Sequence, residues 1–142
     1  AKELLMDVMD TDVLIQTTGG KPLQEIMDGG GIQALLDIEE RTVCGLSVSG
    51  TVIAPGGSVV LIPRAMASLR RSGVIVFLDV PLDLIEKRID LNSRGTIREP
   101  GDTIADVWRK REPLYRASAD VIVDCGGLDQ TSVARRIAGI LS

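Results

Sequence analysis

Short apolar runs alternate with longer amphipathic stretches along this chain. Residues 51–54, 74–78 and 121–123 are apolar runs of single-strand length, and a further run at 5–8 ends at Asp10-Thr11-Asp12. Helical patterns separate these runs. Strands that alternate with helices are typical of βα units, so the pattern predicts an α/β fold with a parallel sheet. Because the 74–78 run is apolar throughout, we expect it to be buried on both faces.

Helix signals fill the segments between the predicted strands. Gly19-Gly20 and Gly29-Gly30-Gly31 are expected to stop helices, and Gly73 to cap one. Thr103 and Asp106 resemble a capping box. In the stretch from 32 to 43, the apolar spacing predicts that Glu39, Glu40 and Arg41 face outward. Helices are predicted to begin at Val13, Pro22 and Thr103. Further helices are predicted to span residues 32–43, 63–71, 81–89 and 130–141.

Composition narrows the function classes. The 142 residues suffice for one domain, 1–142, and contain no evident linker or repeat. A net charge of -4 and three aromatic residues argue against nucleic-acid binding. No apolar run reaches the roughly 18 residues of a membrane span. Without histidine, Ser-His triads and histidine zinc sites are excluded. We expect a cytoplasmic protein in which Cys44 and Cys125 are reduced core thiols.

Two carboxylates follow the first predicted strand. Asp10 and Asp12 would lie at the carboxyl end of that strand, which is the edge where open α/β sheets bind ligands. Such a pair could hold Mg²⁺ through water and accept a proton from a substrate hydroxyl. The alternative is a turn with a helix cap at Asp12.

A glycine turn follows the 51–54 strand. At Gly56-Gly57-Ser58 a ligand could approach the backbone closely, and free N–H groups could bind an anion. The alternative is a tight turn without a ligand.

Arginines gather around a polar loop at 92–103. Arg88, Arg94 and Arg98 lie on or beside it, as in loops that cover the reactants of phosphoryl transfer. A solvated charge run is the alternative. Arg111 is expected on the inward side of a helix, where it would need an anionic partner.

In chain order these segments resemble the shikimate kinase family. The segments that carry the resemblance are Asp10-Thr11-Asp12 with Val13-Leu14-Ile15, 52–57, 76–79, Arg111-x-Pro113-Leu114-Tyr115, and Ala119-Asp120. The resemblance implies a P-loop NTPase fold of the nucleoside-monophosphate-kinase-like type, with three layers and a parallel sheet. It also implies transfer of the γ-phosphoryl group of ATP to a hydroxyl of shikimate or a related metabolite.

The resemblance also implies roles for individual residues. Asp10 would act with the Mg²⁺ shell, and Asp12 would contact the substrate hydroxyls and accept the proton. Gly56, Gly57 and Arg111 would bind the substrate, Arg111 through a carboxylate. The 92–103 loop would be the lid over the reactants, and its Arg94, or else Arg98, would reach the transferred phosphate. Arg88 would flank the adenine. All three arginines are candidates for nucleotide binding.

The sequence departs from the family pattern. Leu35-Leu36 stands where the family has Phe-Arg before a glutamate, here Glu39, so half of the expected carboxylate clamp is missing. The glycine turn ends in Ser58, and the lid reads Ser93-Arg94-Gly95-Thr96-Ile97. A neutral Leu36 suits a substrate that is less acidic than shikimate, or whose acidic group lies elsewhere.

A phosphate-binding loop ending in Gly-Lys-Ser/Thr is not found in these residues. From the resemblance we expect that the first, central strand and its loop precede Ala1. The chain alone would then be inactive, and the complete protein would be a monomer. The alternatives are a noncatalytic binding or regulatory relative, and another kinase of the same fold.

Overall fold

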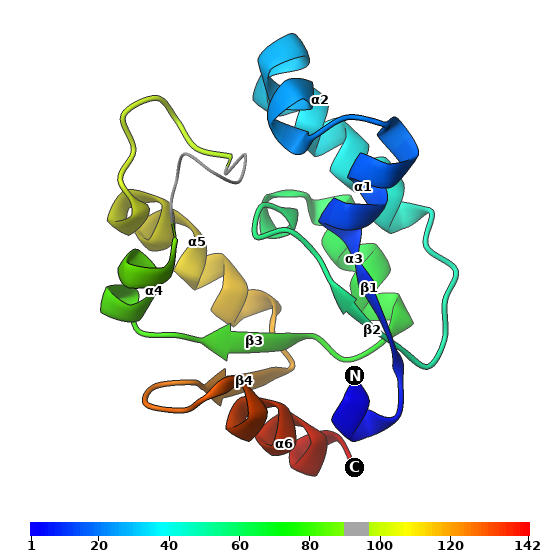
Figure 1. The fold of residues 1–142 in the computed structure, drawn as a ribbon, viewed down its shortest axis with the longest axis vertical. Coiled ribbons are helices and arrows are strands. Elements are labelled where there is room, and N and C mark those ends of the chain that lie inside the picture. The colour runs from blue at the N-terminus through cyan, green and yellow to red at the C-terminus, as the bar shows by residue number, and fades with distance from the viewer. Residues whose placement is uncertain (90–96) are drawn as a thin grey trace.

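The computed structural model describes residues 1–89 and 97–142 (Figure 1). Its strands form two separate parallel pairs. In the first, β1 (Asp7–Asp10) pairs with β2 (Thr51–Ala54). In the second, β3 (Val76–Asp79) pairs with β4 (Val121–Asp124). The parallel arrangement that the alternating pattern predicted is therefore confirmed.

Helices connect the strands within and between the pairs. Two 3₁₀ turns and six α-helices occur among the described residues: η1 (Lys2–Leu4), α1 (Thr11–Gly19), α2 (Leu23–Cys44), η2 (Val59–Leu61), α3 (Pro63–Ser72), α4 (Leu82–Arg88), α5 (Ile104–Ser118) and α6 (Gln130–Leu141). The α-helices follow the predicted order with boundaries shifted by a few residues, and α2 spans the two helices predicted from Pro22 and over 32–43; η1 and η2 were not predicted.

Local capping explains where several helices begin. Asp10 caps α1, because its Oδ1 accepts hydrogen bonds from the backbone N–H groups of Asp12 and Val13. The predicted capping box of Thr103 and Asp106 begins α5. The sequence predicted that α1 begins at Val13, and the alternative interpretation made Asp12 a helix cap. In the structure, the cap is Asp10.

The glycine run interrupts α2, as predicted, and separates it into two helical segments at Gly31. Gly31 has φ 72° and ψ -175°, a backbone conformation that glycine adopts at little steric cost. The residues that follow continue as helix to Cys44. This second segment carries Leu35, Glu39 and Val43 on one face, at spacings of four residues.

A small apolar core lies between α2, η2 and α3. Its fully buried members are Val43, Val59, Ile62 and Ala65, and Leu36, Met66 and Leu69 pack against them. Leu36, which stands at the position of the expected arginine, therefore contributes to packing in this core.

Helix α5 connects the two strand pairs. Its Tyr115 hydroxyl donates to the Gly57 carbonyl, 2.6 Å away, beyond the end of β2. On the other side, Tyr115 stacks on Phe77 of β3 with ring centroids 5.3 Å apart. Trp108 completes this aromatic cluster, with its ring centroid 6.2 Å from that of Phe77. The aromatic residues thus join the halves of the molecule.

The burial expected for the 74–78 segment and for Cys44 was wrong. Val74 is 58% exposed and Leu78 is 46% exposed, so the 74–78 segment is not buried on both faces. Cys44 is exposed at the end of α2, whereas Cys125 is buried; both are free thiols. In the part of the chain that is described, no helix combines the length and apolar character needed to cross a bilayer.

Candidate functional site

A cavity of about 340 Å³ opens beside the carboxyl ends of β1 and β2. That volume is at the small end of the range for metabolite sites. Most of the lining is apolar, and its polar groups converge from α1, α2, the glycine turn and α5. The described lining residues are Asp12, Ile15, Leu23, Leu35, Glu39, Gly56, Gly57, Ser58, Leu78, Val80, Ile85, Ile89, Ile97, Ile104, Val107, Trp108, Arg111 and Tyr115.

Strand register brings Asp12 to the glycine turn. Asp10 pairs with Ala54, the last residues of β1 and β2, so both chains leave the sheet at the same edge. Asp12 lies in the first turn of α1, and Gly56 lies two residues beyond β2. Parallel strands place residues that are distant in sequence at one edge, and here they place a carboxylate beside a glycine.

Gly56 leaves room for two carboxylates. A Cβ atom built on Gly56 would lie 2.8 Å from Asp12 Oδ1 and 3.0 Å from Glu39 Oε1. Real Cβ contacts are rarely this short, so any side chain here would displace at least one carboxylate. The absent side chain thus leaves the space toward which both acidic groups face.

Gly57 lies against the opposite, basic side of the site. A Cβ atom there would lie 3.1 Å from the Tyr115 hydroxyl and 3.8 Å from Arg111 Nη1. Arg111 is 7% exposed, and its Nη2 donates to the carbonyl of Ile97. Burial raises the pKa of the Tyr115 hydroxyl, which keeps it protonated and able to donate to Gly57.

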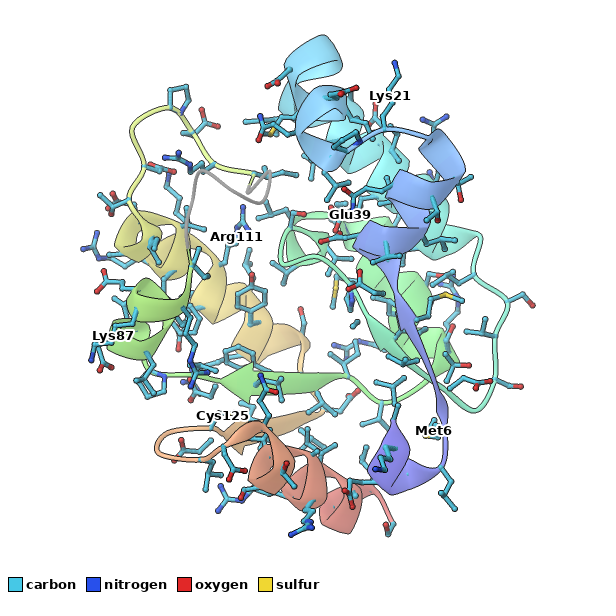
Figure 2. The ribbon with its side chains drawn as sticks, viewed as in Figure 1. Met6, Lys21, Glu39, Lys87, Arg111 and Cys125 are labelled. Carbon is cyan, nitrogen blue, oxygen red and sulfur yellow. The ribbon has the colours of Figure 1, made fainter. Side chains whose placement is uncertain are left out.

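Glu39 is a site residue that sequence reasoning missed. It was expected to face outward, but its side chain is 2% exposed and lines the cavity. Ser58 Oγ donates to Glu39 Oε2 at 2.6 Å. Figure 2 shows Glu39 on α2 and Arg111 on α5, on opposite sides of the cavity. The spacing of Leu35, Glu39 and Val43 could have revealed it, since all three share one helical face.

The environment of Asp12 suits proton transfer. Its side chain is half-buried; this desolvation raises the pKa of the Asp12 carboxyl, and the Asp10 carboxylate raises it further. A carboxylate with a raised pKa is a better proton acceptor than an ordinary aspartate. The site therefore combines a proton acceptor, a backbone turn and a buried guanidinium around one cavity.

The structure brings together four predicted site residues: Asp12, Gly56, Gly57 and Arg111. Asp10 is outside the lining and caps α1.

The predicted nucleotide-binding arginines lie elsewhere. Arg88 is exposed at the end of α4, and Arg98 donates to the carbonyl of Asp102 at 2.9 Å; neither lines the cavity. The predicted lid arginine Arg94 falls outside the described residues.

The described residues offer few ligands for a metal ion. Residues 1–89 and 97–142 contain no group of three or more His, Cys, Asp or Glu side chains that could hold a metal ion. Magnesium in kinases is usually held by substrate phosphates and water with one or two carboxylates. Asp10 and Asp12, at the end of β1, are compatible with that sparse ligation, because only Oδ1 of Asp10 is engaged in capping.

Sequence comparisons identify relatives along nearly the whole chain. A family model described as shikimate kinase matches residues 1–141. The shikimate kinase of Moorella thermoacetica is 33% identical over 141 residues, which cover 96% of this chain and 80% of that protein. The shikimate kinase of Thermodesulfovibrio yellowstonii is also 33% identical, with 96% and 81% covered.

Solved structures agree with these relatives. Shikimate kinase from Acinetobacter baumannii, solved in complex with shikimate, matches with a TM-score of 0.85 and 21% identity, covering 99% of this chain and 83% of the other. Shikimate kinase from Aquifex aeolicus matches with a TM-score of 0.82 and 25% identity over the same shares. These likenesses establish the fold, and the sequence matches establish the lineage: the chain belongs to the shikimate kinase family.

Proposed function

We propose that this protein transfers the γ-phosphoryl group of ATP to a hydroxyl of shikimate or a related small metabolite, which it binds in the cavity described above. The observation that carries the proposal is the convergence of Asp12, Gly56, Gly57 and Arg111 on that cavity, in a member of a kinase family. Most phosphoryl-transfer catalysis consists of positioning and charge stabilisation, which the polar groups of this cavity can supply.

Asp12 is the proposed proton acceptor. Its raised pKa and its place beside Gly56 let it bind the acceptor hydroxyl and take up the proton as the oxygen attacks phosphorus. A positioned general base typically contributes about 100- to 10,000-fold to the rate.

Arg111 and the glycine turn are proposed to orient the acceptor. Arg111 is buried, and its guanidinium can pair with an anionic group of the substrate. The hydrogen bond from Tyr115 to Gly57 holds the turn in place. Orientation of this kind can lower a barrier by several kcal/mol.

The donor side of the reaction is assigned to other groups. Arg94 would contact the transferred phosphoryl group, with Arg98 as the second candidate for this role. Arg88 would flank the adenine. Asp10, through water, and the phosphates of ATP would hold Mg²⁺, which would neutralise charge on the phosphates.

The proposal is tested by assaying the protein expressed from its complete reading frame. ADP release is followed with shikimate and Mg²⁺-ATP, and the product is identified by mass spectrometry. The comparison is with Asp12→Asn, and the control is Asp37→Asn, an exposed helical residue whose carboxylate pairs only with Gln33 among the described residues.

We expect turnover by the wild type and by Asp37→Asn, and a loss of at least about 100-fold in Asp12→Asn, the lower end of general-base effects. Binding of small hydroxylated metabolites without any turnover of ATP would contradict a kinase, and would favour a noncatalytic binding module. Equal turnover by all three proteins would contradict the role of Asp12.

A further inference from the structure

Ser58 stands at the start of the 3₁₀ turn η2 but does not cap it. A serine at the start of a helix commonly accepts a hydrogen bond from a backbone N–H group two or three residues later. At Ser58 the side chain makes no such bond. Its hydroxyl donates instead to Glu39 Oε2, 2.6 Å away on α2. The hydroxyl therefore joins two walls of the cavity, the glycine turn and α2.

The two ends of this hydrogen bond are held in place by one apolar core. Val59 follows Ser58 in the chain, and Val43 lies one helical turn after Glu39. Both valines belong to the same buried cluster, with exposed fractions of 6% and 1%. Because this cluster fixes α2 against the turn, the serine hydroxyl and the glutamate carboxylate are preorganised for their contact.

The carboxylate held by Ser58 borders the space proposed for the acceptor. Glu39 Oε1 and Asp12 Oδ1 lie 3.0 Å and 2.8 Å from the position that a Cβ on Gly56 would take. With Oε2 bound to Ser58, rotation of the carboxylate is restricted, so Oε1 keeps its place beside Asp12. A carboxylate that was free to turn could enter this space and displace the acceptor hydroxyl, and small misplacements of reacting groups are costly.

The same hydrogen bond acts on the charge of Glu39. Burial raises the pKa of the Glu39 carboxyl, and the Ser58 hydroxyl opposes this rise. The charged and titratable groups around the carboxylate are Asp12, which raises this pKa further, Arg111, which lowers it, and Tyr115. Without the hydroxyl, Glu39 would take up a proton at a higher pH.

We propose that Ser58 is a positioning residue for the phosphoryl acceptor: its hydroxyl holds the Glu39 carboxylate against the glycine turn and keeps the space beside Gly56 open for the hydroxyl that Asp12 activates. Ser58 acts through Glu39 and not on the reacting atoms. This inference rests on the proposed function and deepens its acceptor site.

The test separates the hydroxyl of Ser58 from its size. Ser58→Ala removes the hydroxyl, and Ser58→Thr keeps it. The control, Ser72→Ala, removes an exposed hydroxyl that donates to the Ser68 carbonyl within α3. In the protein expressed from its complete reading frame, kcat and the KM values for shikimate and Mg²⁺-ATP are measured between about pH 5 and pH 9. Shikimate affinity is measured by calorimetry, and Ser58→Ala is also made in the Glu39→Gln background.

We expect Ser58→Ala to raise the KM for shikimate by about tenfold, the lower end of the effect of a hydrogen bond to a charged group. The KM for ATP and kcat should change by no more than about twofold, because Ser58 places the acceptor and not the donor. The acidic limb of kcat/KM should move to higher pH, since Glu39 loses a hydrogen bond that favours its ionised form. Ser58→Thr and Ser72→Ala should behave like the wild type.

The Glu39→Gln background distinguishes positioning from a general loss of packing. Two residues that act through one another are not additive, so Ser58→Ala should have little further effect on the KM there and should cause no pH shift. Equal effects in both backgrounds would overturn the inference, as would impairment of Ser58→Thr to the level of Ser58→Ala. With turnover of shikimate by the wild type, either result leaves the kinase intact. Absence of shikimate binding and turnover in the wild type would overturn the proposed function together with this inference.

Discussion

The carboxylates of Asp12 and Glu39 come from different helices and border the same face of Gly56. Asp12 opens α1, whereas Glu39 lies near the end of α2, and their oxygens lie 2.8 Å and 3.0 Å from the position of a Cβ on that glycine. Burial raises the pKa of both carboxyls; the Asp10 carboxylate raises that of Asp12 further, and the Asp12 carboxylate raises that of Glu39 further. The relationship makes Gly56 a sensitive point for binding and for pH.

Gly56→Ala should disrupt the site with little effect on the rest of the fold. The new methyl group would meet both carboxylates, so we expect acceptor binding to weaken by about tenfold or more, since a small misplacement of reacting groups is costly. Gly139→Ala in α6 is the matched control, because its Cβ would meet no atom within 4 Å. That control should stabilise its helix by about 0.5–1 kcal/mol. Equal binding by both variants would contradict the geometry of the turn.

Glu39→Gln should change how stability depends on pH. Because the Glu39 pKa is raised in the folded protein, its contribution is fully present below the ordinary glutamate pKa and is lost as pH rises through the raised value. The charged or titratable groups that act on it are Asp12, Arg111 and Tyr115. Urea unfolding between about pH 4 and pH 8 should show a flatter decline for the variant. Parallel curves for the two proteins would mean that Glu39 is not desolvated.

Tyr115→Phe should loosen the glycine turn. The variant loses the hydrogen bond to the Gly57 carbonyl but keeps the ring that stacks on Phe77. We expect the free energy of unfolding to fall by about 1 kcal/mol, the usual net value of one hydrogen bond. Acceptor affinity should fall as well. An unchanged free energy of unfolding and affinity would indicate that the turn is held by other contacts.

Thr103→Ala should destabilise α5 through its cap. The Thr103 side chain accepts from the Asp106 N–H, and Asp106 in turn accepts from the Thr103 backbone. Loss of an N-cap threonine costs about 1 kcal/mol, which thermal or urea unfolding can measure. Thr18→Ala, at an exposed position of α1, is the control and should leave stability nearly unchanged. A variant as stable as this control would show that the capping box contributes little.

Locally encoded features of the fold were predictable. The capping box at Thr103 and the helix over Gln130–Leu141 depend on residues close in sequence, and both occur as predicted. The proximity of Asp12 and Gly56 was also predictable, because parallel strands end at a common edge of the sheet. These features need only periodicity and residue type.

Features set by tertiary contacts were less predictable. Strand β3 begins at Val76 rather than Val74, and the Ile75 N–H is bonded to the Asp120 side chain at 2.8 Å instead of to a strand. Glu39 was expected at the surface because of the apolar spacing in residues 32–43. Its burial depends on Ser58, nineteen residues away, which average residue preferences do not reveal.

The role of the cavity is tested most directly by the rate of phosphoryl transfer by Asp12→Asn relative to wild type, in the protein expressed from its complete reading frame. We expect kcat to fall by at least about 100-fold, with the unfolding transition retained. A variant that folds and turns over at the wild-type rate would contradict the claim that this cavity, with Asp12 as its proton acceptor, is where the acceptor hydroxyl reacts.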